Sequence, residues 1–189
     1  MAKIILFGDS ILGGFTDGQM TNKVTNQLRQ AFPTDKIINN SMAGATTEQA
    51  LANVNKRVIR EHPTVVVVNF GVNDAGLALA MSAGRYNNNL NMLVEKIGAK
   101  KVILISPSFT NWRVDRDQSW TRILQFELVT EHVAKHYQLP FLDLAALMQQ
   151  QQNPLTLLQS DGVHLNNQGI KLLVDHLIPL IRTKLTTKE

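Results

Sequence analysis

Serine, histidine and aspartate residues near the two ends of this chain have the types and spacing of a nucleophilic site. Ser10 closes the tripeptide Gly8-Asp9-Ser10, which is also an ordinary turn sequence, directly after the first apolar run. Asp161 and His164 lie three residues apart near the other end. A serine hydroxyl attacks a carbonyl when a base takes its proton. Asp161 could bond one imidazole nitrogen of His164 and leave the other free as that base.

Two further residues could stabilise negative charge on a carbonyl oxygen under attack. Asn73, in Gly71-Val72-Asn73-Asp74, carries a side-chain N–H donor with no proton chemistry of its own. Gly44 ends the segment Asn40-Ser41-Met42-Ala43-Gly44, and a glycine lets its backbone N–H approach a substrate closely. Each segment alone also fits a plain turn or loop. Only the combination predicts a serine hydrolase.

Short apolar runs alternate with longer stretches of helical periodicity, as in repeated βαβ units. Each run is too short for a buried helix, and their β-branched character predicts parallel strands covered by helices on both faces. The runs are Ile4 to Phe7, Ile37-Ile38, Val65 to Val68, Val102 to Ile105 and Phe141-Leu142. We therefore expect an α/β fold, a three-layer α/β/α sandwich with about five parallel strands. Ligands bind such a sheet at the carboxyl ends of its strands, where Ser10 and Asn73 would lie.

Four segments have the apolar spacing of amphipathic helices. Thr46 and Gln49 have the spacing of a capping box at the start of the first. The four segments are Thr46 to Val58, Leu90 to Ile97, Ile123 to Tyr137 and about Gly169 to Lys184. Pro179 lies inside the last segment, and we expect it to kink that helix.

Composition narrows the class of protein. The length suits one domain, and we expect residues 1–189 to form a single catalytic domain. The 19 basic and 15 acidic residues are scattered, which predicts a solvated surface rather than a nucleic-acid partner. The absence of cysteine excludes disulfides, thiolate metal sites and cysteine nucleophiles. The first apolar run is too short for a signal peptide or a membrane span, so we expect a soluble, cytoplasmic protein.

Two other interpretations are open to the sequence. His132 and His136 have the spacing of two metal ligands on one helix face. The Glu of the known helix motif is missing and no acidic third ligand is near, so a solvated helix face is favoured and no metal is expected. A binding module of flavodoxin-like fold is the alternative from a different class. No Gly-x-Gly-x-x-Gly pattern follows the first strand, which disfavours a dinucleotide role.

The four segments together resemble the ordered sequence blocks of the SGNH, or GDSL-type, hydrolases. These blocks are Gly8-Asp9-Ser10-Ile11, Gly44, Gly71-Val72-Asn73-Asp74 and Asp161-Gly162-Val163-His164, and they span nearly the whole chain. The resemblance implies a flavodoxin-like sandwich that hydrolyses carboxylic esters, sometimes thioesters, with no metal or cofactor. The chain departs from the usual pattern at Ile11, where leucine is usual, and at Ser41, where the second block usually has glycine.

Carried over residue by residue, the resemblance makes Ser10 the nucleophile, His164 the general base and Asp161 its orienting partner. The backbone N–H groups of Ser10 and Gly44 and the side chain of Asn73 would form the oxyanion hole. The expected mechanism passes through an acyl-Ser10 intermediate, and the expected partner is a small-molecule ester.

Three segments that follow strands are expected to line the substrate pocket, namely Gly13 to Met20, Ala75 to Arg85 and Pro107 to Trp120. The aromatic and basic residues of the third could receive an apolar acyl chain, stack on a sugar or simply pack the loop; they are Phe109, Trp112, Arg113, Arg116 and Trp120. The sequence contains no long insertion that would form a lid over the pocket. We therefore expect an open cleft for small or short-chain esters. Carbohydrate acetylesterase, lysophospholipase and thioesterase activities are the alternatives within the family.

Overall fold

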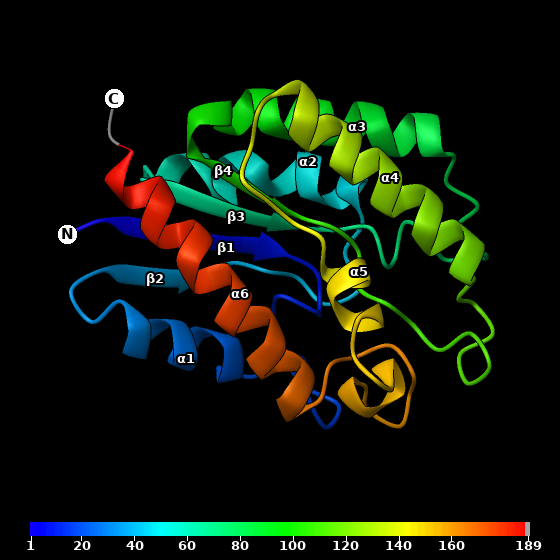
Figure 1. Cartoon of the computed structure of the whole chain (residues 1–189). Helices are drawn as coiled ribbons and strands as arrows, with labels where there is room; N and C mark the ends of the chain where they lie inside the picture. The colour runs from blue at the N-terminus through cyan, green and yellow to red at the C-terminus, as the bar shows by residue number, and fades with distance from the viewer. Residues whose placement is uncertain (188–189) are drawn as a thin grey trace.

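A computed structural model describes residues 1–187 and contains a five-stranded parallel sheet of order β2-β1-β3-β4-β5 (Figure 1). Every apolar run of the sequence lies inside a strand, so the prediction of five parallel strands is confirmed. The strands are β1 (Lys3–Gly8), β2 (Lys36–Asn39), β3 (Val65–Asn69), β4 (Val102–Ile105) and β5 (Phe141–Leu142).

Helices cover both faces of the sheet, which gives the expected three layers. Figure 1 shows α1 (Lys23–Ala31) and α6 (Asn167–Thr186) on one side. The other side carries α2 (Thr47–Arg57), α3 (Ala83–Ile97) and α4 (Trp120–His136). The short helix α5 (Leu144–Gln149) follows β5, and 3₁₀ turns span Ile59–Glu61, Ala99–Lys101 and Pro154–Leu157. Within residues 1–187, no helix combines the length and the apolar character needed to cross a membrane.

The alternation of side chains along β1 explains why this strand is apolar throughout. Ile4 and Leu6 point into the core beneath α1 and α6, whereas Ile5 and Phe7 point into the core beneath α2, α3 and α4. All four side chains are fully buried. A strand covered on both faces needs apolar residues at every position, unlike the alternating pattern of a half-exposed strand.

The helix ends agree with the sequence where capping residues mark them. Thr46 and Gln49 form the predicted capping box at the start of α2. The last helix begins at Asn167, two residues before the expected start, because the side chain of Asn166 accepts the N–H groups of Gln168 and Gly169. Helix α6 continues without a break through Pro179.

Two helices have no clear signal in the sequence. Only three residues of α1 are buried, namely Val24, Thr25 and Leu28, so its apolar stripe is sparse. Helix α5 has six residues, which is too short to display a helical period. Its start is fixed by Asp143, whose side chain accepts the N–H of Ala146.

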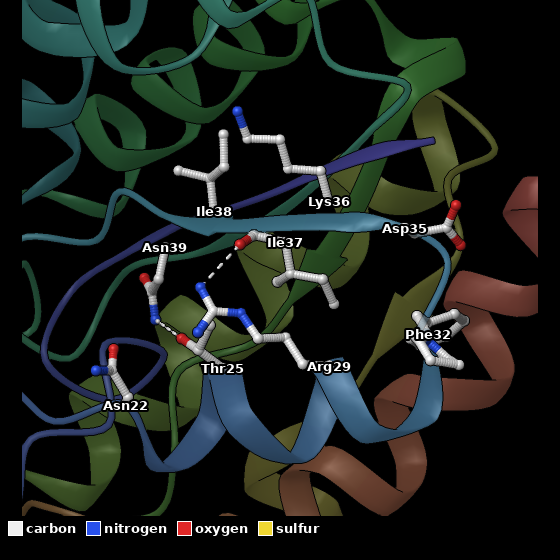
Figure 2. A pocket seen from close by; sticks show the side chains of 10 residues that line it. Asn22, Thr25, Arg29, Phe32, Asp35, Lys36, Ile37, Ile38 and Asn39 are labelled. Carbon is white, nitrogen blue, oxygen red and sulfur yellow. Dashed lines mark hydrogen bonds between the residues drawn. The ribbon is translucent and has the colours of Figure 1, made fainter. Parts of the chain in front are cut away.

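A cavity of about 590 Å³ lies between α1 and the edge strand β2 (Figure 2). Polar side chains bridge this groove. The Arg29 guanidinium donates to the carbonyl of Ile37 at 3.4 Å, and the Asn39 amide donates to the Thr25 hydroxyl at 3.2 Å. The residues that line this groove include no serine, cysteine or histidine. The groove therefore lacks the nucleophile and the base that a reactive site of this kind needs.

A buried carboxylate on α4 places a charge inside the fold. Glu127 is 9 % exposed, and its Oε2 has no hydrogen-bond partner among the described residues. Burial, followed by the negative charge of nearby Asp143, raises the pKa of Glu127 to about 7. An ionised Glu127 therefore opposes folding above neutral pH, and this opposition disappears as the pH falls from about 7 towards the unfolded value near 4.5.

We expect Glu127→Gln to raise the free energy of unfolding at pH 8 by about 1 to 3 kcal/mol, because it removes the buried charge. The gain should shrink towards zero by about pH 4.5, where the native Glu127 is protonated in both states. Urea unfolding followed by circular dichroism at pH 5 to 8 measures it. Asp175→Asn, in an exposed ion pair with Lys171 on α6, is the control and should change stability by less than about 0.5 kcal/mol. A gain independent of pH would contradict the assignment.

Candidate active site

Ser10 lies at the carboxyl end of β1, the strand between β2 and β3 in the sheet. After Gly8 the chain turns tightly, with the N–H of Gly13 donating to the carbonyl of Asp9 and the N–H of Phe15 donating to that of Ser10. Ser10 is only 6 % exposed, yet it lines an open pocket of about 330 Å³. The turn therefore presents a single hydroxyl at the edge of the sheet.

His164 and Asp161 meet Ser10 at this edge, as the sequence predicts. The Nε2 atom of His164 lies 3.0 Å from the Ser10 hydroxyl oxygen, although the residues are 154 positions apart in the chain. The Nδ1 atom of His164 lies 2.8 Å from Oδ2 of Asp161. The carboxylate therefore accepts the Nδ1 proton and leaves Nε2 facing the hydroxyl as an acceptor.

Asp161 is held in place by its own loop. Its Oδ1 atom accepts the backbone N–H groups of Val163 and His164, at 2.9 and 3.0 Å. Burial opposes ionisation of Asp161, but these two hydrogen bonds, the hydrogen bond from the His164 ring and the electrostatic attraction of that ring outweigh it and lower the pKa of the carboxyl. Asp161 is therefore charged at neutral pH and available to orient the imidazole.

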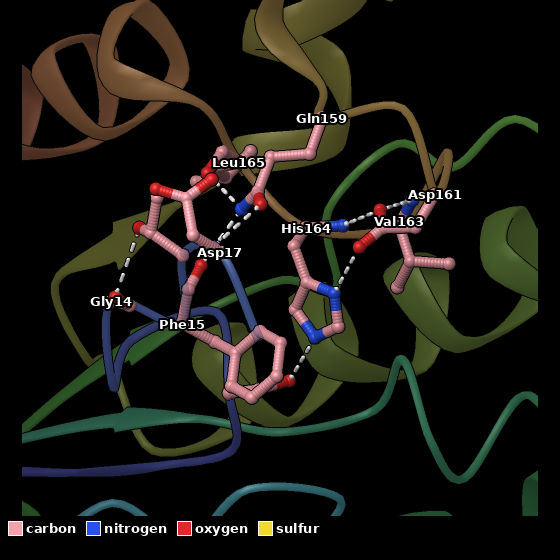
Figure 3. A network of polar contacts seen from close by, with 10 residues as sticks. Gly14, Phe15, Asp17, Gln159, Asp161, Val163, His164 and Leu165 are labelled. Atoms are coloured by element: carbon pink, nitrogen blue, oxygen red, sulfur yellow. Dashed lines mark hydrogen bonds and ion pairs between the residues drawn. The ribbon is translucent and has the colours of Figure 1, made fainter. Parts of the chain in front are cut away.

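Gln159 connects the loop of His164 to the loop that follows Ser10 (Figure 3). Its side-chain amide donates to the carbonyls of Phe15 and Leu165, at 2.8 and 2.9 Å, and its side-chain oxygen accepts the N–H of Asp17. Its backbone N–H also donates to the carbonyl of His164 at 2.8 Å. Gln159 thus fixes the distance between the base and the nucleophile. It belongs to no sequence motif, so the sequence offers no signal for it.

Phe15 lies against the imidazole of His164, with ring centroids 4.4 Å apart and an angle of 33° between the rings. Figure 3 shows the His164 ring between Asp161 and Phe15. The contact restricts the rotation of the imidazole about its side-chain bonds. Phe15 falls in the segment Gly13 to Met20 that the sequence places around the pocket, but no spacing singles it out.

Asn73 follows β3 and reaches the same pocket. Its side-chain nitrogen donates to the carbonyl of Ala45 at 3.0 Å and faces Oδ2 of Asp9 at 3.4 Å. The turn before it requires Gly71, whose φ is +123° and whose missing Cβ would lie 2.5 Å from the Tyr86 hydroxyl. The amide is therefore oriented by one good hydrogen bond and one long one.

Gly44 places a third donor at the pocket. Its φ of +70° is a left-handed conformation that favours glycine, although no neighbouring atom would meet a Cβ there. Among the described residues, the backbone N–H groups of Ser10 and Gly44 donate to no protein acceptor. Ser41 stands where the second sequence block of the family usually has glycine. Its N–H donates to Oδ1 of Asn39 at 3.1 Å, and Gly44 lines the pocket despite this difference.

Two buried carboxylates lie directly behind these residues. Burial raises the pKa of Asp9 to about 7, against the hydrogen bond from the N–H of Ile11 and with the aid of the negative charge of Asp74. Burial also raises the pKa of Asp74, although the N–H and hydroxyl of Thr47 donate to its carboxylate. Partial protonation of Asp9 limits the negative charge beneath Ser10, where a full charge would oppose an oxyanion.

The pocket walls differ in part from the sequence expectation. The segment Pro107 to Trp120 contributes polar residues to the Ser10 pocket, namely Asp115, Asp117 and Gln118. The remaining lining residues are Ser10, Phe15, Ala43, Gly44, Asn73, Asp161, Val163 and His164. The segment Ala75 to Arg85 lines an adjacent cavity of about 540 Å³ instead, through Ala78 and Leu79.

Of the alternatives for the aromatic residues of the third segment, packing within the loop is favoured, because none of these residues lines the Ser10 pocket. Trp112, Trp120 and Arg116 line a neighbouring cavity of about 450 Å³. Phe109 packs against the Trp120 ring, with centroids 5.1 Å apart. Phe109 and Trp112 precede the two aspartates in the loop and Trp120 follows them. The pattern of apolar residues does not reveal which side of a loop faces a pocket.

The arrangement contains a hydroxyl, a base, an orienting carboxylate and three N–H groups around one pocket. These are the functional groups that acyl transfer requires. Among residues 1–187, no group of three or more His, Cys, Asp or Glu side chains is placed to hold a metal ion. The ring of His136 packs edge-on against Tyr137.

Comparisons with known proteins agree with this chemistry. The model of the GDSL-like lipase/acylhydrolase family matches residues 6–172. Isoamyl acetate-hydrolyzing esterase 1 homologs of Homo sapiens and Rattus norvegicus are 28% and 27% identical to the chain over 211 residues. Each alignment covers 98% of this chain and 83% of the relative.

Solved structures share the whole fold. A lipase/acylhydrolase from Enterococcus faecalis matches with a TM-score of 0.92 and 32% identity, covering 100% of this chain and 98% of that one. An acetylxylan esterase from Geobacillus stearothermophilus matches with a TM-score of 0.75 over 95% of this chain and 94% of that one. At 21% identity, this second likeness concerns the fold alone.

Proposed function

The chain belongs to the GDSL-like lipase/acylhydrolase family and is a carboxylic ester hydrolase; within that activity, we propose that it cleaves small, short-chain esters through an acyl-Ser10 intermediate. The observation that carries the proposal is the contact of 3.0 Å between Nε2 of His164 and the Ser10 hydroxyl, with Asp161 on the opposite ring nitrogen. A base held this way is what an otherwise weak serine nucleophile needs.

In the first step His164 takes the Ser10 proton as the hydroxyl oxygen attacks the carbonyl carbon of the ester. The tetrahedral intermediate collapses, the bond to the leaving alkoxide breaks, and His164 returns the proton to the alcohol. In the second step His164 takes a proton from water, whose oxygen attacks the acyl-Ser10 carbonyl. Collapse of that intermediate releases the acid and restores the Ser10 hydroxyl.

The developing oxyanion takes hydrogen bonds from the backbone N–H groups of Ser10 and Gly44 and from the side chain of Asn73. Both N–H groups of the Asn73 amide have partners in the resting site. The bond to Ala45, at 3.0 Å, orients the amide, whereas the contact with Asp9, at 3.4 Å, is long. The N–H facing Asp9 is therefore the one that a stronger, charged acceptor can recruit.

The dimensions and lining of the pocket support a small acyl group. The Ser10 pocket measures about 330 Å³, and its apolar contribution is limited to Phe15, Ala43 and Val163. A long acyl chain needs a continuous apolar surface, because only the burial of its methylene groups offsets the conformational entropy that the chain loses on binding. The human and rat relatives named for isoamyl acetate are consistent with a short-chain ester substrate.

Ser10→Ala should lower the hydrolysis rate of 4-nitrophenyl acetate by at least about three orders of magnitude, because no other group forms the acyl intermediate. A fluorophosphonate probe should label the native protein and not the variant. Ser160→Ala, at an exposed position of the histidine loop, is the matched control and should keep both properties. A well-folded native protein that resists the probe would instead favour a binding module without catalysis.

Asn73→Ala should lower kcat on the same ester by roughly 10² to 10³, the usual effect of one oxyanion donor. Steady-state kinetics separate this from a loss of binding, since a role in the transition state lowers kcat and kcat/KM together. Asn55→Ala, on the exposed face of α2, serves as the control. A change confined to KM would show that Asn73 binds the ground state only.

A series of 4-nitrophenyl esters tests the acyl length. We expect kcat/KM to fall by about tenfold or more from the butanoyl to the octanoyl ester, because the polar pocket offers no apolar surface to four further methylene groups. Activity that rises towards octanoyl would contradict the short-chain assignment and leave the serine mechanism intact. Product analysis with acetylated sugars, lysophospholipids and thioesters separates the remaining family activities.

A further inference from the structure

A buried carboxylate, that of Asp74, connects the two loops that carry the oxyanion donors Gly44 and Asn73. Asp74 directly follows Asn73, and its Oδ1 atom accepts both the backbone N–H of Thr47, at 2.9 Å, and the Thr47 hydroxyl. Thr47 lies three residues after Gly44 and is the first residue of α2. Asp74 and Thr47 are both fully buried. Their contact therefore joins the loop after β3 to the loop after β2.

The Thr47 hydroxyl is held in the orientation that this contact needs. The side-chain amide of Asn89, on α3, donates to the Thr47 hydroxyl oxygen at 2.9 Å, which leaves the hydroxyl proton for Asp74. A backbone N–H in the first turn of a helix has no partner within the helix, and a carboxylate there also complements the positive end of the helix dipole. Asp74 thus caps the start of α2 from a different loop.

The charge of Asp74 has a cost that the fold alone does not explain. Burial raises the pKa of Asp74 although Thr47 donates two hydrogen bonds to it, so the ionised carboxylate opposes folding. Its Oδ2 atom has no hydrogen-bond partner among the described residues. The Arg122 guanidinium donates to the backbone carbonyls of Asp74 and Ala75, at 3.3 and 2.6 Å. A neutral pair of side chains could join the loops without a buried charge, so the carboxylate points to a role in the reaction.

The position of Gly44 depends on contacts of this kind. Gly44 has a φ of +70°, and no neighbouring atom lies within 4 Å of where its Cβ would be, so packing does not hold it. The carbonyl of Ala45 accepts the Asn73 amide at 3.0 Å, and Thr47 binds Asp74 two residues further on. These two contacts between the loops fix the distance between the Gly44 N–H and the Asn73 amide. Donors to an oxyanion act over roughly 2.7 to 3.1 Å, so a small displacement of either one weakens them.

We propose that Asp74 is a positioning residue of the oxyanion hole, because its contact with Thr47 sets the spacing between the Gly44 N–H and the Asn73 side chain. The role rests on the proposed serine mechanism, since this spacing matters only if an oxyanion forms at Ser10. Asp74 is fully buried and is not among the residues that line the Ser10 pocket, so it acts through the two donors. Weakening the contact therefore removes stabilisation of the transition state and changes the binding of the ester little.

The kinetics of Asp74→Asn on 4-nitrophenyl acetate test the role. This change keeps the shape of the side chain and an oxygen for the Thr47 N–H, but it removes the charge that strengthens both hydrogen bonds. We expect kcat and kcat/KM to fall together by about tenfold, with KM within about twofold of the native value. A fluorophosphonate probe counts the reactive serines in each preparation, so that unfolded molecules do not enter kcat. Glu127→Gln, which removes another buried carboxylate, on α4, is the matched control and should keep kcat within about twofold.

Substitutions of Thr47 test the same contact from the other loop. Thr47→Val keeps the volume of the side chain and removes the hydroxyl, and we expect kcat to fall by about threefold to tenfold. Thr47→Ser restores the hydroxyl and should return kcat to within about twofold of the native value.

A double-mutant cycle with Asn73→Ala distinguishes positioning from a general loss of structure. If Asp74 acts through the donors, Asp74→Asn should lower kcat by about threefold or less in the Asn73→Ala background, against about tenfold in the native background. A general loss of structure would lower kcat by the same factor in both backgrounds, and that result would overturn the proposal.

The activity of the native protein separates the positioning role from the mechanism on which it rests. If the native protein hydrolyses the ester and reacts with the probe while Asp74→Asn keeps kcat within about twofold, the positioning role is wrong and the serine mechanism stands. The role is also wrong if Thr47→Ser is as slow as Thr47→Val, because the hydroxyl is then not the group that matters. A well-folded native protein that neither hydrolyses the ester nor reacts with the probe would overturn the proposed mechanism itself.

Discussion

The parallel pairing of β1 between β2 and β3 is the constraint on which the site depends. Because all three strands run in one direction, their carboxyl ends meet at one edge of the sheet, and the loops that leave them are neighbours. Ser10, Gly44 and Asn73 come from these three loops. Strand register thus brings Ser10 and the N–H donors to one edge, and side-chain hydrogen bonds, such as that from Asn73 to the carbonyl of Ala45, then orient the donors. The register is itself fixed by apolar side chains buried on both faces of β1.

The histidine arrives by a different route. It precedes α6, which packs on the face of the sheet opposite α2 and α3, and no strand carries it to the serine. Its place is set by hydrogen bonds of the loop itself, through Asp161 and Gln159, and by the ring of Phe15. Because a loop holds His164, the distance between its imidazole and Ser10 depends on these contacts.

Buried carboxylates recur around this site and oppose the stability of the fold. Asp9 and Asp74 lie behind the serine with raised pKa values, and each accepts hydrogen bonds that order the loops of the donors. The chain carries a net charge of +4, yet the pocket is lined by aspartates and by no lysine or arginine of the described residues. Such local charge is characteristic of sites shaped by their ligands rather than by folding.

The layers of the fold and the residues proposed for the site follow from the amino-acid sequence. Short apolar runs predicted all five strands, and motifs in a fixed order predicted that Ser10, Gly44, Asn73, Asp161 and His164 share a site, because these features are local. The sequence did not reveal α1 and α5, whose apolar patterns are sparse or short. The folded chain was needed to show that Phe15 and Gln159 contact the His164 loop and that Asp115, Asp117 and Gln118, rather than the tryptophans, line the Ser10 pocket. The side of a loop that faces a pocket depends on contacts between segments far apart in the chain, and no local pattern encodes those contacts.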